Sequence, residues 1–106
     1  MRDISVEELA RWRAEKNDFV LLDVREPSEI AAAGIGGSVP IPMRQIAERL
    51  NELDRAATIA VLCHHGGRSE RVAEFLEAQG FAHVVNVAGG INEYALRVDP
   101  DIPIYS

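Results

Sequence analysis

The chain has 106 residues, of which 47% are apolar and 26% are charged, a balance that is typical of a globular domain and excludes extended disorder. Seventeen acidic against eleven basic residues give a formal charge of −6 without a basic cluster, which argues against nucleic acid or an anionic membrane as a partner. No apolar run approaches the length of a membrane span and the first residues lack a signal-peptide core, so we expect a single soluble, cytoplasmic domain over residues 1–106.

The first third of the chain is predicted to form a strand, a helix, a second strand and a second helix. Residues 3–4 suit a very short strand, and Ser5, with glutamate three residues later, matches the capping box that opens a helix. Residues 19–22 form a compact apolar run, which favours a buried strand of a parallel sheet. Pro27 suits the first turn of a short helix, and Gly34 can end that helix.

The middle of the chain is predicted to hold a short edge strand, a helix and a buried strand. Residues 34–42 contain two prolines, which cannot donate hydrogen bonds to a sheet, so any strand here is short and lies at an edge. Apolar residues at helical spacing then predict a helix with one buried face: Met43, Ile46, Ala47, Leu50 and Leu53. Residues 59–62 are a second compact apolar run and predict another buried strand.

The last third of the chain is predicted to form a helix, a strand and a final helix. The first of these helices runs from near Ser69 to Gly80, which can supply its C-terminal cap. Its buried face is predicted to hold Val72, Phe75 and Leu76. Residues 84–87 predict a strand, and the glycines at 89–90 turn the chain into the final helix.

This alternation of strands and short-joined helices, about four times along the chain, is the signature of an α/β domain with a mainly parallel sheet. In such sheets ligands bind at the carboxyl ends of the strands. Asp23, Cys63 and Gly89 each follow a predicted strand, so we expect them to lie on one rim of the sheet.

One loop on that rim carries the chemistry that the sequence predicts. Its residues are Cys63, His64, His65, Gly66, Gly67, Arg68 and Ser69. The glycines allow backbone angles that turn successive amides inward, and the following helix adds free N–H groups and the positive end of its dipole. Together with Arg68 these groups are expected to hold negative charge and to favour a thiolate. Cys63 is the only cysteine, which excludes an internal disulfide and a CxxC redox pair.

Three residues of this loop also have other interpretations. Cys63 can be a small buried side chain at a strand end, as free cysteine often is. His64 and His65 can tune the pocket as hydrogen-bond donors or can simply face solvent. A metal site formed by the three is disfavoured, because adjacent side chains point apart and no CxxC or HxxxH spacing is present. We therefore expect no bound metal.

Charged residues after the first buried strand are predicted to support the loop: Asp23, Arg25 and Glu29. Arg68 can bind an anion, or it can pair with Asp23 or Glu29 and hold the loop to the sheet. Asp23 and Arg25 are interpreted chiefly as a structural pair, although Arg25 can also help to draw an anion into the site.

Four motifs follow one another along the chain: Asp23-Val24-Arg25-Glu26-Pro27 with Glu29, Cys63-x-x-Gly66-x-Arg68-Ser69, Gly80-Phe81 with Val84, and Val87-x-Gly89-Gly90-Ile91. In this order they resemble a single-domain rhodanese of the rhodanese-like sulfurtransferase superfamily, and the tail, Pro103-x-Tyr105, is similar to that of some bacterial members. The resemblance covers nearly the whole chain. It implies a three-layer sandwich, in which a sheet of about five mainly parallel strands carries helices on both faces.

The resemblance also implies sulfur transfer through a Cys63 persulfide. The thiolate attacks the outer sulfur of a donor such as thiosulfate, sulfite leaves, and cyanide, a thiol or a protein cysteine then removes the sulfur. The donors to the persulfide would be loop amides from His64 to Arg68, with Ser69. No cofactor is implied beyond this covalent intermediate, and the implied partners are small sulfur donors and acceptors and a sulfur-accepting protein.

Two other functions stay open. A noncatalytic module of the same fold would serve binding or regulation, although such modules usually lose the cysteine that this chain keeps. Cysteine phosphatases and arsenate reductases have five residues between cysteine and arginine, whereas four separate Cys63 from Arg68. The smaller ring suits one sulfur atom better than a phosphate.

The chain departs from the family's pattern in two places. Residues 34–42 are shorter by one than the usual segment and lack its histidine and first proline, so we assign them only a structural part. Tyr94 replaces the usual tryptophan of the last motif, a packing change that leaves the thiol chemistry untouched.

Overall fold

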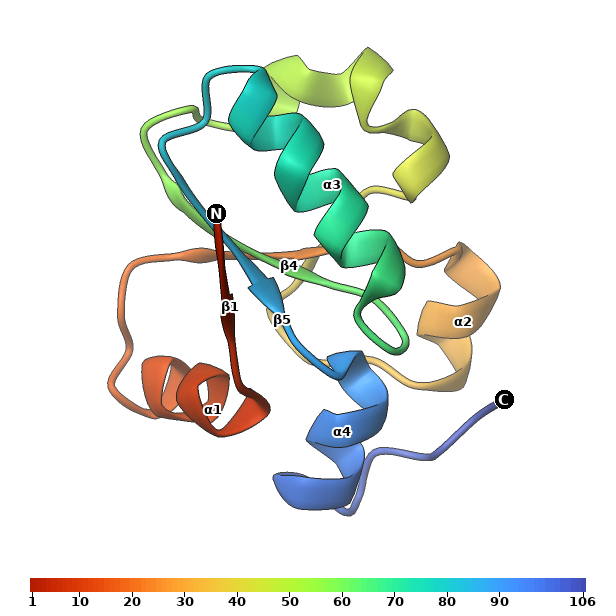
Figure 1. Cartoon of the computed structure of the whole chain (residues 1–106). Coiled ribbons are helices and arrows are strands. Elements are labelled where there is room, and N and C mark those ends of the chain that lie inside the picture. Colours follow the sequence, from red (N-terminus) through yellow and green to blue (C-terminus); the bar gives the residue numbers. More distant parts are fainter.

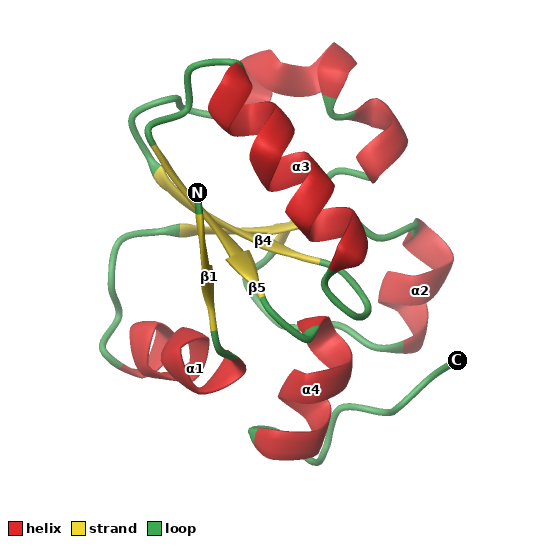
Figure 2. Ribbon diagram, viewed as in Figure 1, coloured by secondary structure: helices red, strands yellow, loops and turns green.

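The computed structural model describes residues 1–106 and shows a parallel sheet between two helical layers (Figures 1 and 2). The five strands lie in the order β1 (Arg2–Ile4), β5 (His83–Val87), β4 (Thr58–Leu62), β2 (Val20–Asp23) and β3 (Val39–Pro40). The helices are α1 (Val6–Ala14), α2 (Pro27–Ala32), α3 (Gly67–Ala78) and α4 (Gly90–Arg97), with two 3₁₀ segments, η1 (Met43–Gln45) and η2 (Ala47–Glu52). The predicted α/β fold and sheet are confirmed, and β3 is the short edge strand.

The position of strand β4 in the centre of the sheet explains why its residues form a continuous apolar run. Its residues alternate between two cores: Ile59 and Val61 pack in the core below α3, whereas Ala60 and Leu62 pack in the core that α1 and α4 cover. Both faces of the strand are therefore buried, and a continuous apolar run results. No helix of the chain is long and apolar enough to cross a bilayer.

The predicted helix ends need two corrections. Ser5 caps α1, because its Oγ accepts a hydrogen bond from the Glu8 amide at 3.0 Å, but the Glu8 carboxylate faces Arg2 at 3.4 Å instead of closing a capping box. Helix α2 ends at Ala32, where the extended backbone of Ala33 stops it before Gly34 is reached.

The predicted helix over residues 43–53 is wrong in type. The structure has η1 and η2 there, with a break at Arg49, whose φ is −115°. The apolar residues fall in pairs three apart, and a 3₁₀ helix with three residues a turn brings each pair to one side: Met43 with Ile46, and Leu50 with Leu53.

Helix α3 confirms two of its three predicted buried residues. Val72 and Leu76 are buried, and so is Ala73, but Phe75 is 36% exposed. Phe75 lies at the edge of the buried stripe and lines a shallow apolar groove together with Met43. A bulky apolar residue at helical spacing was therefore not enough to place it in the core.

The carboxyl ends of the strands meet as expected. Asp23 pairs in register with Leu62, so the chain leaves β2 and β4 side by side. The Ile91 amide, at the start of α4, donates to the carbonyl of Cys63 at 2.9 Å. The C-terminal tail returns toward α2 (Figure 1), which brings a fourth segment to the same rim.

Candidate active site

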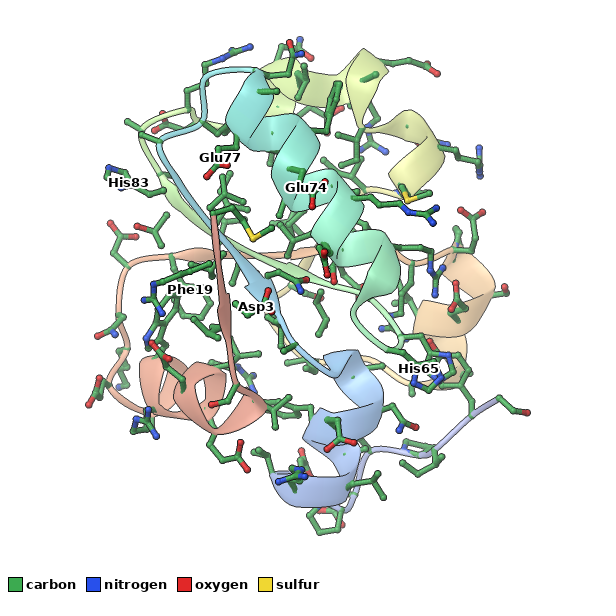
Figure 3. The ribbon with its side chains drawn as sticks, viewed as in Figure 1. Asp3, Phe19, His65, Glu74, Glu77 and His83 are labelled. Carbon is green, nitrogen blue, oxygen red and sulfur yellow. The ribbon has the colours of Figure 1, made fainter.

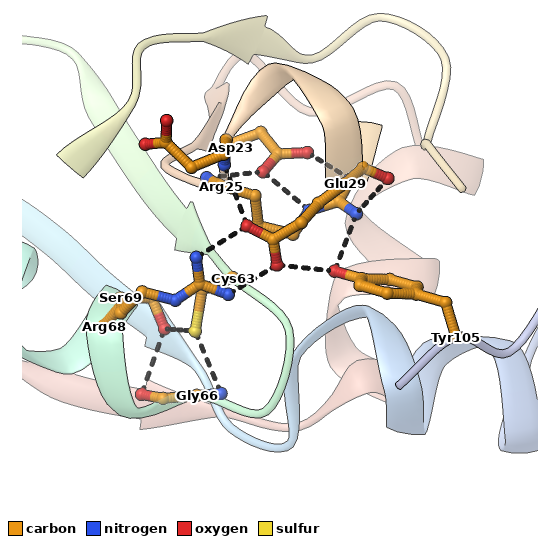
Figure 4. A network of polar contacts seen from close by, with 9 residues as sticks. Asp23, Arg25, Glu29, Cys63, Gly66, Arg68, Ser69 and Tyr105 are labelled. Atoms are coloured by element: carbon orange, nitrogen blue, oxygen red, sulfur yellow. Dashed lines mark hydrogen bonds and ion pairs between the residues drawn. The ribbon is translucent and has the colours of Figure 1, made fainter. Parts of the chain in front are cut away.

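The loop after β4 closes around the sulfur of Cys63. Gly66 turns the backbone with φ +107°, and its amide donates to Sγ at 3.0 Å (Figure 4). A Cβ on Gly66 would lie 3.1 Å from the Gly89 amide nitrogen, so the positive φ and the close approach both favour glycine. One of the amides expected to face the sulfur is therefore in place.

The start of α4 holds the other side of the loop. The Asn92 amide donates to the carbonyl of His64 at 3.1 Å, and the Ile91 amide donates to the carbonyl of Cys63. Gly90 lies against the carbonyls of Cys63 and His64 with φ +61°, and a Cβ there would lie 2.4 Å from the His64 oxygen. The carbonyls of Cys63 and His64 are thus bonded to α4, and the Gly66 amide is the backbone amide that donates to Sγ.

Ser69 contacts the sulfur from α3. Its Oγ lies 3.3 Å from Sγ of Cys63 and 2.5 Å from Oδ1 of buried Asn86. The Asn86 amide donates to Asp3 at 3.1 Å, which turns Oδ1 toward Ser69; Asp3 lies on β1 beside β5 (Figure 3). Because a hydroxyl has one proton, Ser69 donates to Asn86 and accepts from the thiol, so the prediction that Ser69 donates to the sulfur is wrong. This pairing was not visible in the sequence.

The side chain of Arg68 forms an ion pair with a residue of α2. Its guanidinium makes two hydrogen bonds of 2.7 Å with the carboxylate of Glu29, one of the two acidic partners considered (Figure 4). The hydrogen bonds from Arg68 lower the pKa of Glu29 to about 2, although partial burial opposes them. The pair therefore ties the loop to α2 and cancels the charge that the sequence assigned to the pocket.

Asp23 and Arg25 are a structural pair, as interpreted. Both side chains are fully buried, and the guanidinium meets the carboxylate at 2.9 and 2.7 Å. Burial lowers the pKa of Arg25, but its hydrogen bonds with Asp23 and Tyr105 outweigh burial and leave it raised. Arg25 also donates to the Tyr105 hydroxyl at 3.1 Å, so it has no free face for an anion.

Tyr105 completes this network, although sequence reasoning gave it no part in the site. Its hydroxyl donates to Glu29 at 3.1 Å, and its ring stacks on His64 with centroids 3.9 Å apart and planes at 9°. The tail motif Pro103-x-Tyr105 was the only signal for it. The last residues of the chain thus brace both the Glu29 pair and the loop.

The two histidines occupy different environments. His64 is half-buried against Tyr105, and burial, followed by the nearby His65, lowers its pKa. Its Nε2 is buried without a hydrogen-bond partner. His65 is exposed and its ring lies against that of His64, with centroids 3.8 Å apart and planes tilted by 31°; Figure 3 shows it at the outer side of the loop. No three His, Cys, Asp or Glu side chains converge as a metal-binding group.

An open cavity of about 320 Å³ gives access to the loop. It is lined by Cys63, His64, His65, Gly67, Arg68 and Arg71. Five of these six were predicted as site residues. Arg71, on the first turns of α3, was not.

The Glu29 pair predicts a pH dependence of stability. Because the folded pKa is about 2 against an ordinary 4.5, the ionised carboxylate stabilises the fold above pH 4.5, and this contribution is lost as the pH falls through about 2. Urea unfolding of Glu29→Gln should therefore show a deficit at neutral pH that disappears toward pH 2. The control is Glu48→Gln, an exposed and unpaired position. A deficit for Glu29→Gln that is constant with pH would contradict this account.

Comparison with known proteins identifies the family of the chain. The model of the rhodanese-like domain matches residues 5–97. Rhodanese-like/PpiC domain-containing protein 12 of Arabidopsis thaliana is 41% identical, over 99% of this chain but only 38% of its own length. A sulfurtransferase of Allochromatium vinosum is 33% identical, over 90% of this chain and 89% of its own.

A solved structure has the same overall fold. A rhodanese-like domain protein from Staphylococcus aureus superposes with a TM-score of 0.85 at 33% identity, over the whole of both chains. With the family model covering most of the chain, the protein belongs to the rhodanese-like domain family.

Proposed function

We propose that this protein is a sulfurtransferase of the rhodanese type, which carries sulfane sulfur on Cys63. The observation that carries the proposal is the environment of the thiol. Cys63 lines the cavity but is only 1% exposed, and its Sγ accepts a hydrogen bond from the Gly66 amide at 3.0 Å. A backbone amide aimed at sulfur stabilises negative charge there, and both a thiolate and a persulfide are anionic. Similarity to the Allochromatium sulfurtransferase supports the same class of reaction.

The proposed cycle has two half-reactions. The Cys63 thiolate attacks the outer sulfur of thiosulfate, the S–S bond breaks, and sulfite leaves with the electron pair. Cys63 then carries a persulfide whose terminal sulfur is anionic. Cyanide, a thiol or a protein cysteine attacks that sulfur, and the electron pair of the broken S–S bond returns to Cys63. Each step is a two-electron substitution at sulfur, so the cycle needs no cofactor.

The position of Arg68 favours sulfur over phosphate as the group bound. A phosphate site needs an arginine that is free to grip the oxyanion. Here both outer nitrogens of Arg68 are engaged by Glu29, and only four residues separate Arg68 from Cys63. The arginine at the end of the loop is therefore not free to grip a phosphate held inside the loop.

The test is turnover by the purified chain. Thiosulfate and cyanide are expected to yield thiocyanate and sulfite, while an aryl phosphate in parallel releases no phosphate. If thiosulfate, mercaptopyruvate and organic persulfides all fail to give thiocyanate, the proposal is wrong. A noncatalytic binding module then becomes the better account of the fold.

A further inference from the structure

The cavity beside the thiol has less positive charge than its residues suggest. Arg68 lines it, but its charge is balanced by Glu29 at 2.7 Å. Arg25 lies on the same rim, but it is fully buried and balanced by Asp23. Each pair is neutral as a unit, so neither supplies the net positive charge that would attract an anionic sulfur compound.

His64 does not supply that charge either. Its pKa is lowered, first by burial and then by the nearby His65, which favours the uncharged ring. Stacking on Tyr105 fixes the ring in this half-buried position. The inner wall of the cavity is therefore close to neutral.

Arg71 is the remaining permanent cation of the cavity. It lies three residues after Arg68 on α3, is exposed, and makes no ion pair or side-chain hydrogen bond. The acidic neighbours on its own helix, Glu70 and Glu74, do not pair with it; Glu74 faces outward from α3 in Figure 3. Its guanidinium thus keeps all of its donors for a ligand.

We infer that Arg71 sets the specificity of the Cys63 cavity for anionic reactants. It attracts a dianionic sulfur donor such as thiosulfate to the thiol, and it favours anionic over uncharged reagents of the same size. This inference deepens the proposed sulfurtransferase function and rests on it for the identity of the natural reactant. Arg71 is a binding residue here and takes no part in breaking or forming the S–S bond.

The first experiment measures the charge at the thiol without sulfur transfer. The alkylation rates of Cys63 with anionic iodoacetate and with uncharged iodoacetamide are compared, because their ratio cancels changes in the thiolate fraction. Arg71→Gln is expected to lower the ratio several-fold, and Arg71→Lys to restore most of it. The matched control is Arg11→Gln, which removes an exposed, unpaired arginine from α1. A ratio that is the same in Arg71→Gln and wild type would overturn the inference.

The second experiment measures turnover. Arg71→Gln is expected to raise the KM for thiosulfate about tenfold with a much smaller change in kcat, the scale of one lost charge-assisted hydrogen bond, and to weaken the dependence on salt. An unchanged alkylation ratio rejects the role of Arg71 whatever the KM, while wild-type turnover still upholds the proposed function. If the wild type transfers no sulfur but the alkylation ratio still falls in Arg71→Gln, the proposed sulfurtransferase function is wrong. The selection of anionic reactants by Arg71 is then upheld.

Discussion

Replacing Cys63 with serine is expected to abolish sulfur transfer, with a fall in kcat of about a thousandfold or more, the usual cost of removing a nucleophile. A serine hydroxyl is not ionised at neutral pH and cannot carry sulfane sulfur as a persulfide. The Gly66 amide that meets Sγ at 3.0 Å would remain but would have no anion to stabilise. The measurement is thiocyanate formation at saturating thiosulfate and cyanide.

The same variant should keep the fold. Serine differs from cysteine by one atom, and the loop carbonyls stay bonded to the Ile91 and Asn92 amides. Circular dichroism and the thermal midpoint should therefore change little, which separates loss of chemistry from loss of structure. Turnover by Cys63→Ser above about a hundredth of wild type would show that another group carries the sulfur.

Replacing Asp23 with asparagine is expected to destabilise the protein by about 3–5 kcal/mol. The change leaves the charge of Arg25 in a site that is fully buried and has no other carboxylate within salt-bridge distance. An uncompensated buried charge costs far more than the pair itself contributes. The loss is a large fraction of the stability of an ordinary domain, and urea unfolding followed by circular dichroism measures it.

Two further variants test the cause of this loss. Asp23→Asn combined with Arg25→Met removes the charge as well and should recover much of the stability. Glu52→Gln breaks an exposed pair with Arg49 and should change the unfolding midpoint little. If the free energy of unfolding of Asp23→Asn alone is within about 1 kcal/mol of the wild-type value, the expected cost of an unpaired buried charge at Arg25 is wrong.

The sheet and the loop were predictable because their signals are local. A strand buried on both faces must be apolar along its length, and β4 is such a strand. Gly66 and Gly90 stand at positive φ where a side chain would be strained, so their positions in the sequence mark the turns. The 3₁₀ segments were missed because their apolar spacing of three fits a short stretch of α-helix as well.

The charge balance of the site was not predictable from the sequence. Glu29 lies 39 positions before Arg68, and Tyr105 lies 80 positions after Arg25, so only the fold decides these partners. The sequence left Arg68 either to bind an anion or to pair with Asp23 or Glu29, and the structure pairs it with Glu29 and leaves Arg71 free. Whether a charged side chain in a cavity is left unpaired depends on ion-pair partners that are distant in the sequence, and local sequence patterns do not reveal them.

The most direct test of the account is intact mass spectrometry of the wild-type chain after incubation with thiosulfate. The wild-type chain is expected to gain one sulfur, about 32 Da, which cyanide removes and which Cys63→Ser never acquires. A wild-type chain whose mass stays unchanged with thiosulfate, mercaptopyruvate and organic persulfides would contradict a persulfide on Cys63, and with it the proposed function.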